Sequence, residues 1–168
     1  MTIDIEDLTY RPCVGIMLLN ANGEVFVAQR IDSARGAWQM PQGGIDDGET
    51  PANAARRELK EETGTNNATI IAEYAEWISY DLPDHLIKRL WKGRYRGQTQ
   101  KWFAMRFLGT DEDIDINTAE PEFNAWRWVP MAELLDLVVP FKHHVYAVLV
   151  EAFGHLAGTP GSDSDKRR

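Results

Sequence analysis

Cysteine is nearly absent from this chain of 168 residues, which has only Cys13. One cysteine excludes an internal disulfide framework and is typical of a reducing compartment, so we expect a cytoplasmic protein in which Cys13 is a small core residue. Long hydrophobic runs are also missing. The run at residues 16–19, IMLL, is far shorter than the roughly 20 apolar residues of a membrane-spanning helix. Residues 1–10 carry no basic residue and no apolar stretch, so we expect no secretion signal either.

Positive charge is scarce as well. The chain has 18 lysines and arginines against 26 aspartates and glutamates, a formal net charge of −8. This balance argues against DNA or an anionic membrane as a partner, but it does not exclude an anionic substrate. The segment at residues 87–101 departs from the average because it has six basic residues and no acidic one. It is either a solvated loop or a guide for a polyphosphate or RNA substrate, and the sequence alone leaves both interpretations open.

The order of polar and apolar residues predicts an α/β fold. The chain is long enough for one hydrophobic core, so we expect a single domain over residues 1–157, followed by a disordered tail at residues 158–168. Asn22 and Gly23 predict a hairpin turn between two strands. Further strands are predicted at residues 68–80, 101–109 and 125–129, and helices at residues 130–139 and 141–156. These elements predict a mixed α/β domain with helices packed on a sheet.

A third helix is delimited by its capping residues. Thr50 is a good N-cap, Pro51 suits the first helical position, and Gly64 suits the position just beyond the end. The sequence therefore predicts a helix at residues 51–63. Near its C-terminal end, three glutamates at positions i, i+3 and i+4 share one face: Glu58, Glu61 and Glu62.

The three glutamates break two rules of helix stability. Like charges at this spacing repel, and the C-terminal end of a helix favours cations, at a combined cost on the order of 1–2 kcal/mol. A divalent cation would reverse the local electrostatics, because Mg²⁺ prefers carboxylate oxygens and substrate phosphates as ligands. Just before the helix, Gly43 and Gly44 let the backbone approach a ligand closely. Spacing alone leaves both a metal site and a solvated acidic face open.

Residues 43–64 resemble the Nudix box, the signature of the Nudix hydrolase family. The box runs glycine, five residues, glutamate, seven residues, Arg-Glu, an aliphatic residue, one residue, Glu-Glu, one residue and glycine. The matching positions are Gly43, Glu49, Arg57, Glu58, Leu59, Glu61, Glu62 and Gly64. An aliphatic residue usually comes next, where this chain has Thr65; the difference concerns packing after the helix. By this resemblance, Glu49 and Arg57 form a structural ion pair.

The resemblance implies a Nudix fold, which is a mixed β-sheet sandwiched between helices. It also implies a hydrolase that uses Mg²⁺ or Mn²⁺ to cleave a nucleoside diphosphate linked to another group. It implies that Glu58 and Glu62 are the chief metal ligands. It also implies that Glu61 supports the metal or the attacking water and that the Gly43 carbonyl completes the site. The three glutamates are accordingly the expected catalytic residues. Clustered carboxylates suit this chemistry because they provide metal ligands and a neighbouring base together.

Blocks outside the box resemble the RNA pyrophosphohydrolase and dinucleoside polyphosphate hydrolase branches of the family. These blocks are YRPCVG at 10–15, WQMPQGG at 38–44, GQTQKWF at 97–103, PEFNAWRWV at 121–129 and PFKHHVY at 140–146. The resemblance makes Glu122 an additional metal ligand. It implies contacts to phosphates or to the first nucleotides from Arg11, Arg30, Gln42, Lys101, Phe141 and Lys142, with Phe141 stacking on a base. We interpret His143 and His144 as ordinary helix residues, because carboxylates suit a hard ion better.

The sequence therefore predicts a metal-dependent pyrophosphohydrolase. Its expected substrate is 5′-triphosphorylated RNA, which would leave a 5′-monophosphate end and promote mRNA decay, or a dinucleoside polyphosphate such as Ap4A, which would give ATP and AMP, or both. Two alternatives stay open: a Nudix enzyme that hydrolyses nucleoside triphosphates or ADP-ribose, and a non-catalytic nucleotide-binding module on the same fold. The complete set of glutamates argues against the non-catalytic module, since a pure binder has no need for all three.

Overall fold

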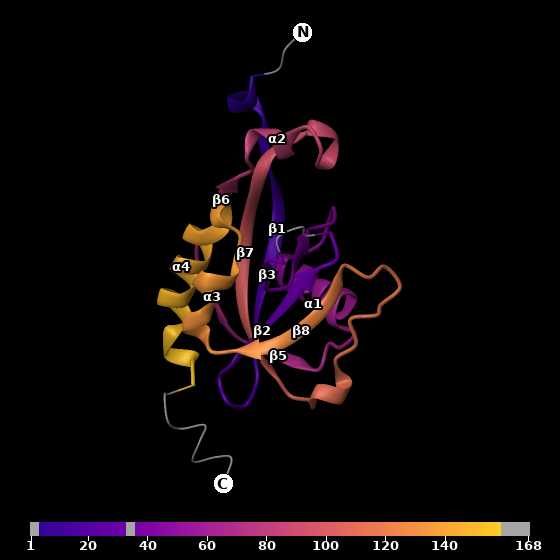
Figure 1. Cartoon of the computed structure of the whole chain (residues 1–168), viewed down its shortest axis with the longest axis vertical. Coiled ribbons are helices and arrows are strands. Elements are labelled where there is room, and N and C mark those ends of the chain that lie inside the picture. The colour runs from indigo at the N-terminus through magenta and orange to yellow at the C-terminus, as the bar shows by residue number, and fades with distance from the viewer. Residues whose placement is uncertain (1–3, 33–35, 159–168) are drawn as a thin grey trace.

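The computed structural model describes residues 4–32 and 36–158 (Figure 1). The strands are β1 (Thr9–Leu19), β2 (Val25–Arg30), β3 (Trp38–Gln39), β4 (Gln42–Gly44), β5 (Ala68–Glu73), β6 (Ile78–Asp81), β7 (Tyr95–Phe107) and β8 (Phe123–Val129). The α-helices are α1 (Pro51–Thr63), α2 (Asp84–Ile87), α3 (Leu134–Leu137) and α4 (His143–Phe153). Of the expected tail, only Gly158 lies within the described residues, where its N–H donates to the carbonyl oxygen of Gly23 at 3.3 Å.

The strands of the described part of the chain form one mixed sheet. Its main path runs β3-β2-β1-β7-β5, and three more strands pair beside it: β4 with β1, β6 with β7, and β8 with β2. Strands β1 and β7 are parallel, and the other pairs are antiparallel. The predicted mixed sheet is therefore confirmed, as is the turn before β2, where Gly23 has a φ of 75°.

Helices cover both faces of the sheet, and each face has its own core (Figure 1). On one face, the apolar side of α1 packs on alternate residues of β1: Ala54, Ala55 and Leu59 meet Val14, Ile16 and Leu18. On the other face, α3 and α4 pack on the remaining residues of β1 and on β7: Leu134, Val145, Tyr146 and Leu149 meet Met17, Leu19, Trp102 and Ala104. The period of two along each strand thus divides the apolar residues between two cores.

Helix α1 begins and ends at the predicted residues. The Thr50 hydroxyl accepts a hydrogen bond from the N–H of Asn53 at 3.2 Å, which caps the first turn. Gly64 ends the helix in the left-handed region with a φ of 79°, and a Cβ there would collide with the backbone of Asp115. These local signals fix the position of the glutamate-bearing turn relative to β4.

Two regions differ from the sequence prediction. The helix expected at residues 130–139 is a 3₁₀ turn at Met131–Glu133 followed by the short α3, because Pro130 and Pro140 confine it at both ends. The basic segment is not one loop either. It forms the end of α2, a 3₁₀ turn at Trp91–Gly93 and the start of β7. No helix among the described residues is long and apolar enough to cross a membrane.

Candidate active site

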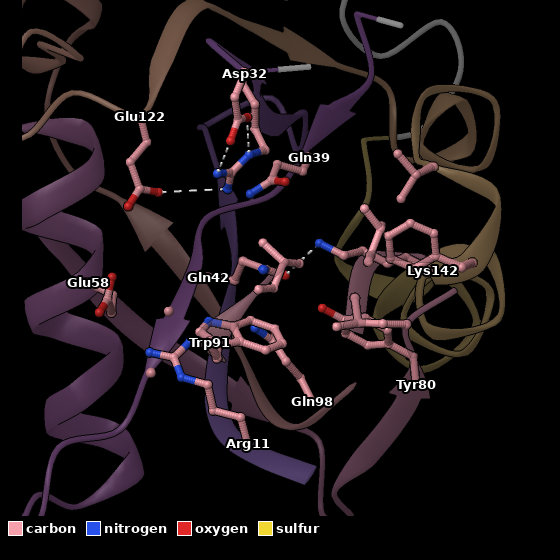
Figure 2. A pocket seen from close by; sticks show the side chains of 18 of the residues that line it. Arg11, Asp32, Gln39, Gln42, Glu58, Tyr80, Trp91, Gln98, Glu122 and Lys142 are labelled. Atoms are coloured by element: carbon pink, nitrogen blue, oxygen red, sulfur yellow. Dashed lines mark hydrogen bonds and ion pairs between the residues drawn. The ribbon is translucent and has the colours of Figure 1, made fainter. Parts of the chain in front are cut away.

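A pocket of about 530 Å³ opens at the junction of β1, β4, β6 and β7, beside α1 (Figure 2). Most of the residues expected from the sequence line it: Arg11, Arg30, Gln42, Gly43, Glu58, Glu61, Glu122, Phe141 and Lys142. A second cavity of about 580 Å³ adjoins the first, because Glu58, Glu61 and Glu122 line both. Glu62 lines the second cavity. The expected residues that meet here come from β1, β2, β4, α1, the loop before β8 and the 3₁₀ turn at Pro140–Lys142.

Lys101 is the exception among the expected residues, because it does not line this pocket. Alternate residues of β7 point to opposite faces of the sheet, and Lys101 lies on the face away from Gln98 and Gln100. Its Nζ donates to the carbonyl oxygen of Ala75 at 2.8 Å and lies 3.8 Å from Glu73. Lys101 therefore ties β7 to the neighbouring segment outside the pocket.

Arg57 lies at the centre of the acidic cluster. Its guanidinium makes a two-pronged pair with Glu49, at 2.8 and 2.9 Å, and donates to the carbonyl oxygen of Gly44 at 2.8 Å. The same guanidinium also contacts Glu58 at 2.8 Å and Glu61 at 3.1 Å. The sequence predicted repulsion among the three glutamates with no counter-charge in the chain, but Arg57 offsets part of this repulsion.

Glu58 lies directly against the backbone of Gly43. A Cβ at position 43 would overlap the Glu58 carboxylate, so glycine is required for this close approach. Burial raises the pKa of Glu58 to about 7, the Arg57 pairing opposes this rise, and the charges of Glu61 and Glu122 add to it. A carboxyl group with a pKa near neutrality exchanges protons readily at physiological pH.

Glu62 is the most buried of the three glutamates and connects α1 to β4. Its carboxylate accepts the backbone N–H of Gln42 at 3.1 Å. Burial raises the pKa of Glu62 well above its usual value, and the nearby charges of Glu122 and Glu58 raise it further. The electrostatic coupling between Glu58, Glu62 and Glu122 shows that the loop before β8 brings its glutamate to the helix.

These carboxylates fit a hard divalent cation in their chemistry. Their oxygens are the ligands that Mg²⁺ prefers, and their mutual repulsion is the kind of cost that a cation removes. Within residues 4–32 and 36–158, however, no three His, Cys, Asp or Glu side chains already converge as a metal-binding group. Glu58 and Glu61 are paired with Arg57 instead. Metal binding would thus compete with Arg57 for these two carboxylates.

Two cations face the pocket without a carboxylate partner among the described residues. The Arg11 guanidinium lies 5.3 Å from the centre of the Trp91 ring. Lys142 is buried, with its Nζ 3.3 Å from Gln42 Oε1 and 5.4 Å from the centre of the Tyr80 ring. Burial lowers the pKa of Lys142 to about 8, and the charge of Arg30 lowers it further. An anionic ligand would provide the counter-charge that both lack.

Arg30 and Phe141 occupy other parts of the same pocket. Arg30 pairs with Asp32 through two hydrogen bonds of 2.8 and 3.0 Å, and it lies 4.0 Å from Glu122. Phe141 packs against Tyr80 with ring centres 5.8 Å apart, so its ring forms an aromatic surface at the pocket. Arg30 thus links the acidic side of the site to the side with the cations.

Sequence reasoning missed several residues of the pocket, namely Asp32, Gln39, Tyr80, Trp91 and Gln98. Gln98 had a usable signal: GQTQKWF places two glutamines at a spacing of two on one strand face, where buried amides are unusual. Trp91 had no such signal. Its backbone is left-handed, with a φ of 48°, and residues other than glycine rarely adopt this conformation, so the sequence did not predict where the side chain lies.

Comparison with known proteins agrees with this geometry. The model of the NUDIX domain family matches residues 9–149, most of the chain. The chain belongs to the Nudix family. Its Nudix box forms the turn of α1 and the β4 loop around Glu58 and Gly43.

Curated Nudix relatives cover nearly the whole chain. An RNA pyrophosphohydrolase of Roseobacter denitrificans is 58% identical over 152 residues, which are 89% of this chain and 95% of the relative. The RNA pyrophosphohydrolase of Sphingopyxis alaskensis is 57% identical over 156 residues, 92% of this chain and 99% of the relative. That of Rhodospirillum rubrum is 60% identical over 143 residues, 85% of this chain and 86% of the relative.

Solved structures share the Nudix fold at lower identity. The E. coli dihydroneopterin triphosphate pyrophosphohydrolase superposes with a TM-score of 0.65 at 21% identity, covering 86% of this chain and 99% of that one. A C. elegans Ap4A hydrolase binary complex gives a TM-score of 0.62 at 18% identity, covering 86% of this chain and 98% of that one. These structures confirm the predicted α/β fold.

Proposed function

We propose that this Nudix protein is a cytoplasmic RNA pyrophosphohydrolase that uses Mg²⁺ or Mn²⁺. It would remove pyrophosphate from 5′-triphosphorylated RNA, leave a 5′-monophosphate end and so promote mRNA decay. The observation that carries the proposal is the meeting of opposite charges in two adjoining cavities, with four glutamates on one side and Arg11 with Lys142 on the other. A metal-bound phosphate chain needs both. The relatives named RNA pyrophosphohydrolase support the choice of substrate.

The metal would be held by Glu58, Glu62 and Glu122, with Glu61 and the Gly43 carbonyl close by. When bound, the cation would neutralise phosphate oxygens and favour attack by water. Arg11 and Lys142 would bind the phosphate chain by charge, and Phe141 would stack on a base. Glu61 would support the metal or the attacking water.

Dinucleoside polyphosphates are the second candidate substrate. Ap4A also joins nucleosides through a charged phosphate chain, so the same cations and the Phe141 ring would bind it. The two substrates are separated by competing them at matched Mg²⁺ and comparing kcat/KM. An RNA product with a 5′-monophosphate and a preference for RNA would support the first candidate, whereas ATP and AMP released at a higher kcat/KM from Ap4A would replace it with the second.

The catalytic assignment is tested with Glu62→Gln. This variant keeps the shape of the side chain and removes its charge. We expect turnover of triphosphorylated RNA to be lost while affinity for nucleotide is largely kept. Turnover equal to that of the unaltered protein would exclude Glu62 from catalysis, and an inactive unaltered protein that still binds nucleotide would favour the non-catalytic module.

A further inference from the structure

Four glutamines lie in or under the pocket. Gln39, Gln42 and Gln98 line it, and Gln100 is buried beneath them. A side-chain amide can present either its carbonyl oxygen, which accepts, or its NH₂ group, which donates. The direction of each amide therefore decides whether the pocket offers acceptors or donors to a ligand.

Trp102 fixes the direction of the first amide. Its indole N–H donates to Oε1 of Gln100 at 3.0 Å, and an indole can only donate. The NH₂ group of Gln100 must then lie on the other side. It donates to Oε1 of Gln98 at 2.8 Å and to Oε1 of Gln42 at 3.0 Å.

Lys142 fixes the same direction from the opposite end. Its ammonium group also can only donate, and it donates to Oε1 of Gln42 at 3.3 Å. Two groups that can only donate thus agree on the orientation of the whole network. The carbonyl oxygens of Gln42 and Gln98 are used within it, so the NH₂ groups are what remain for other partners.

Strand pairing places Gln98 among the ligand-facing side chains. Gln98 of β7 is the register partner of Arg11 on β1 and of Tyr80 on β6. Figure 2 shows Arg11, Gln98 and Tyr80 along one side of the pocket. A donor at Gln98 therefore lies between the guanidinium and the aromatic surface formed by Tyr80 and Phe141.

Gln39 provides an independent observation. Its Nε2 is the single buried side-chain nitrogen or oxygen without a hydrogen-bond partner in the described part of the chain. Gln39 is 6% exposed and lines the same pocket. A buried donor without a partner is costly, so an acceptor on a bound ligand is its natural complement.

We propose that Gln39 and Gln98 bind the substrate as hydrogen-bond donors, and that Trp102, acting through Gln100, fixes the donor direction of Gln98 and Gln42. The inference rests on the proposed function for the class of substrate, a nucleotide with a polyphosphate chain. The acceptors are oxygens of that substrate, in its phosphate chain or in a nucleobase.

Removal of each donor is the first test. Gln39→Met and Gln98→Met keep the length of the side chain and remove its amide. We expect KM for triphosphorylated RNA to rise about tenfold in each, the worth of one hydrogen bond to a charged group, while kcat changes by less than about threefold. Gln29→Met is the matched control, because the Gln29 amide donates to the Gly36 carbonyl outside the pocket.

A binding measurement separates this inference from the proposed function. Calorimetric titration with the α,β-methylene analogue of ATP needs no turnover. Weaker binding by Gln39→Met and Gln98→Met than by Gln29→Met supports the donor role even if the unaltered protein hydrolyses nothing. Binding and KM equal to the control overturn it.

The direction of the Gln98 amide is tested by Gln98→Glu. A carboxylate of the same shape still accepts from Gln100 but presents a negative oxygen to the phosphate chain. We expect a larger loss than with methionine, about 100-fold in affinity, with a melting temperature that shows a folded protein. Affinity equal to that of Gln98→Met would show that Gln98 does not donate a hydrogen bond to the ligand.

The positioning role is tested at Gln100. Gln100→Glu still accepts from Trp102 but has no NH₂ group. The Gln98 amide therefore loses the donor that holds its carbonyl oxygen and turns its own NH₂ group toward position 100, away from the pocket. We expect KM to rise about tenfold with kcat unchanged, a split that a general loss of folding would not produce. An unchanged KM in a folded variant overturns the positioning role.

The two sources of acceptor oxygen are distinguished with RNAs that differ only in their first two bases. A loss in Gln39→Met or Gln98→Met that is equal for all RNAs identifies the phosphate chain. A loss that depends on the base identifies the nucleobase.

Discussion

The acidic and the basic side of the two adjoining cavities differ in how their charged groups are paired. On the acidic wall, formed by Glu58, Glu61, Glu62 and Glu122, Arg57 of the same helix is paired with two of the carboxylates. On the basic wall, formed by Arg11 and Lys142, the described residues provide no carboxylate partner. Arg11 and Lys142 lie instead against aromatic rings, the Cys13 sulfur and an amide oxygen.

This difference in pairing indicates which kind of ligand each wall is suited to bind. Arg57, the internal counter-ion, lowers the repulsion on the acidic wall without a bound metal, and the metal of the proposed function would compete with Arg57 for these carboxylates. A basic wall without one keeps its full charge for the ligand, because aromatic faces hold a cation without neutralising it. The acidic wall is thus suited to exchange a cation, and the basic wall to capture an anion.

The largest effect is expected on the acidic wall. Glu58→Gln removes the carboxylate that lies against Gly43, so we expect kcat to fall by about 10²- to 10⁴-fold with little change in KM. Steady-state kinetics on triphosphorylated RNA measure both. Glu112→Gln, on an exposed 3₁₀ turn, is the control, and equal rates for the two variants would remove Glu58 from the mechanism.

The basic wall is expected to show the opposite kinetic pattern. Lys142→Met removes a buried ammonium group that lacks a carboxylate partner, so KM should rise about 10- to 100-fold, with a smaller change in kcat. Lys101→Met is the matched control, since Lys101 lies on the other face of β7. A rise in KM for Lys101→Met as large as for Lys142→Met would instead support the expected contact between Lys101 and the substrate.

The pH dependence of stability is a third way to compare the walls. The pKa of Glu58 is about 7 in the folded protein against a usual value of 4.5, so the folded state keeps this proton to higher pH. Without divalent ions, the free energy of unfolding should therefore fall as pH rises from about 4.5 to 7, by on the order of 3 kcal/mol. Glu62 acts in the same direction.

This pH profile is measured by urea unfolding in the presence of a chelator. Glu58→Gln should flatten it, because the variant has no proton to lose at that position. A profile that rises across this window in the unaltered protein would contradict the burial of these carboxyl groups in the folded state.

The smallest effect is expected from the internal counter-ion. Arg57→Met leaves Glu49, Glu58 and Glu61 without their shared partner, so the free energy of unfolding should fall by about 1–2 kcal/mol in metal-free buffer. Mg²⁺ should recover part of this loss. Arg56→Met, the exposed neighbour, is the control, and an equal effect of the two variants would mean that Arg57 does not hold the acidic wall together.

Local sequence signals predicted the helix and its glutamates well. Thr50, Pro51 and Gly64 act over a few residues, so their effect on α1 does not depend on the rest of the fold. The turn at Gly23 follows from a local signal of the same kind. Cys13 is buried, as expected for a small residue in an apolar strand. By contrast, the helix expected at residues 130–139 is mostly a 3₁₀ turn and a short helix, since prolines at both ends outweighed its apolar period.

Local sequence signals could not predict which side chains contact each other across the sheet. The resemblance to the Nudix box predicted the pair of Arg57 with Glu49, but the sequence did not show that Arg57 also contacts Glu58 and Glu61. The face of β7 on which Lys101 lies depends on the strand register, and a shift of one residue reverses it. The spacing of Gln98 and Gln100 placed both on one face of β7, but the direction of their amides depends on neighbours from other segments, as does the position of Gln39 in the pocket.

The sequence by itself determined the family box, the bounds of α1 and the presence of acids and bases in the same chain, because capping and spacing act locally. Only the tertiary structure decided which charges are paired, which are buried and which amides donate toward the pocket. Those properties depend on distances between segments as far apart as Gln42 and Lys142, which are set when the two cores pack on opposite faces of one sheet.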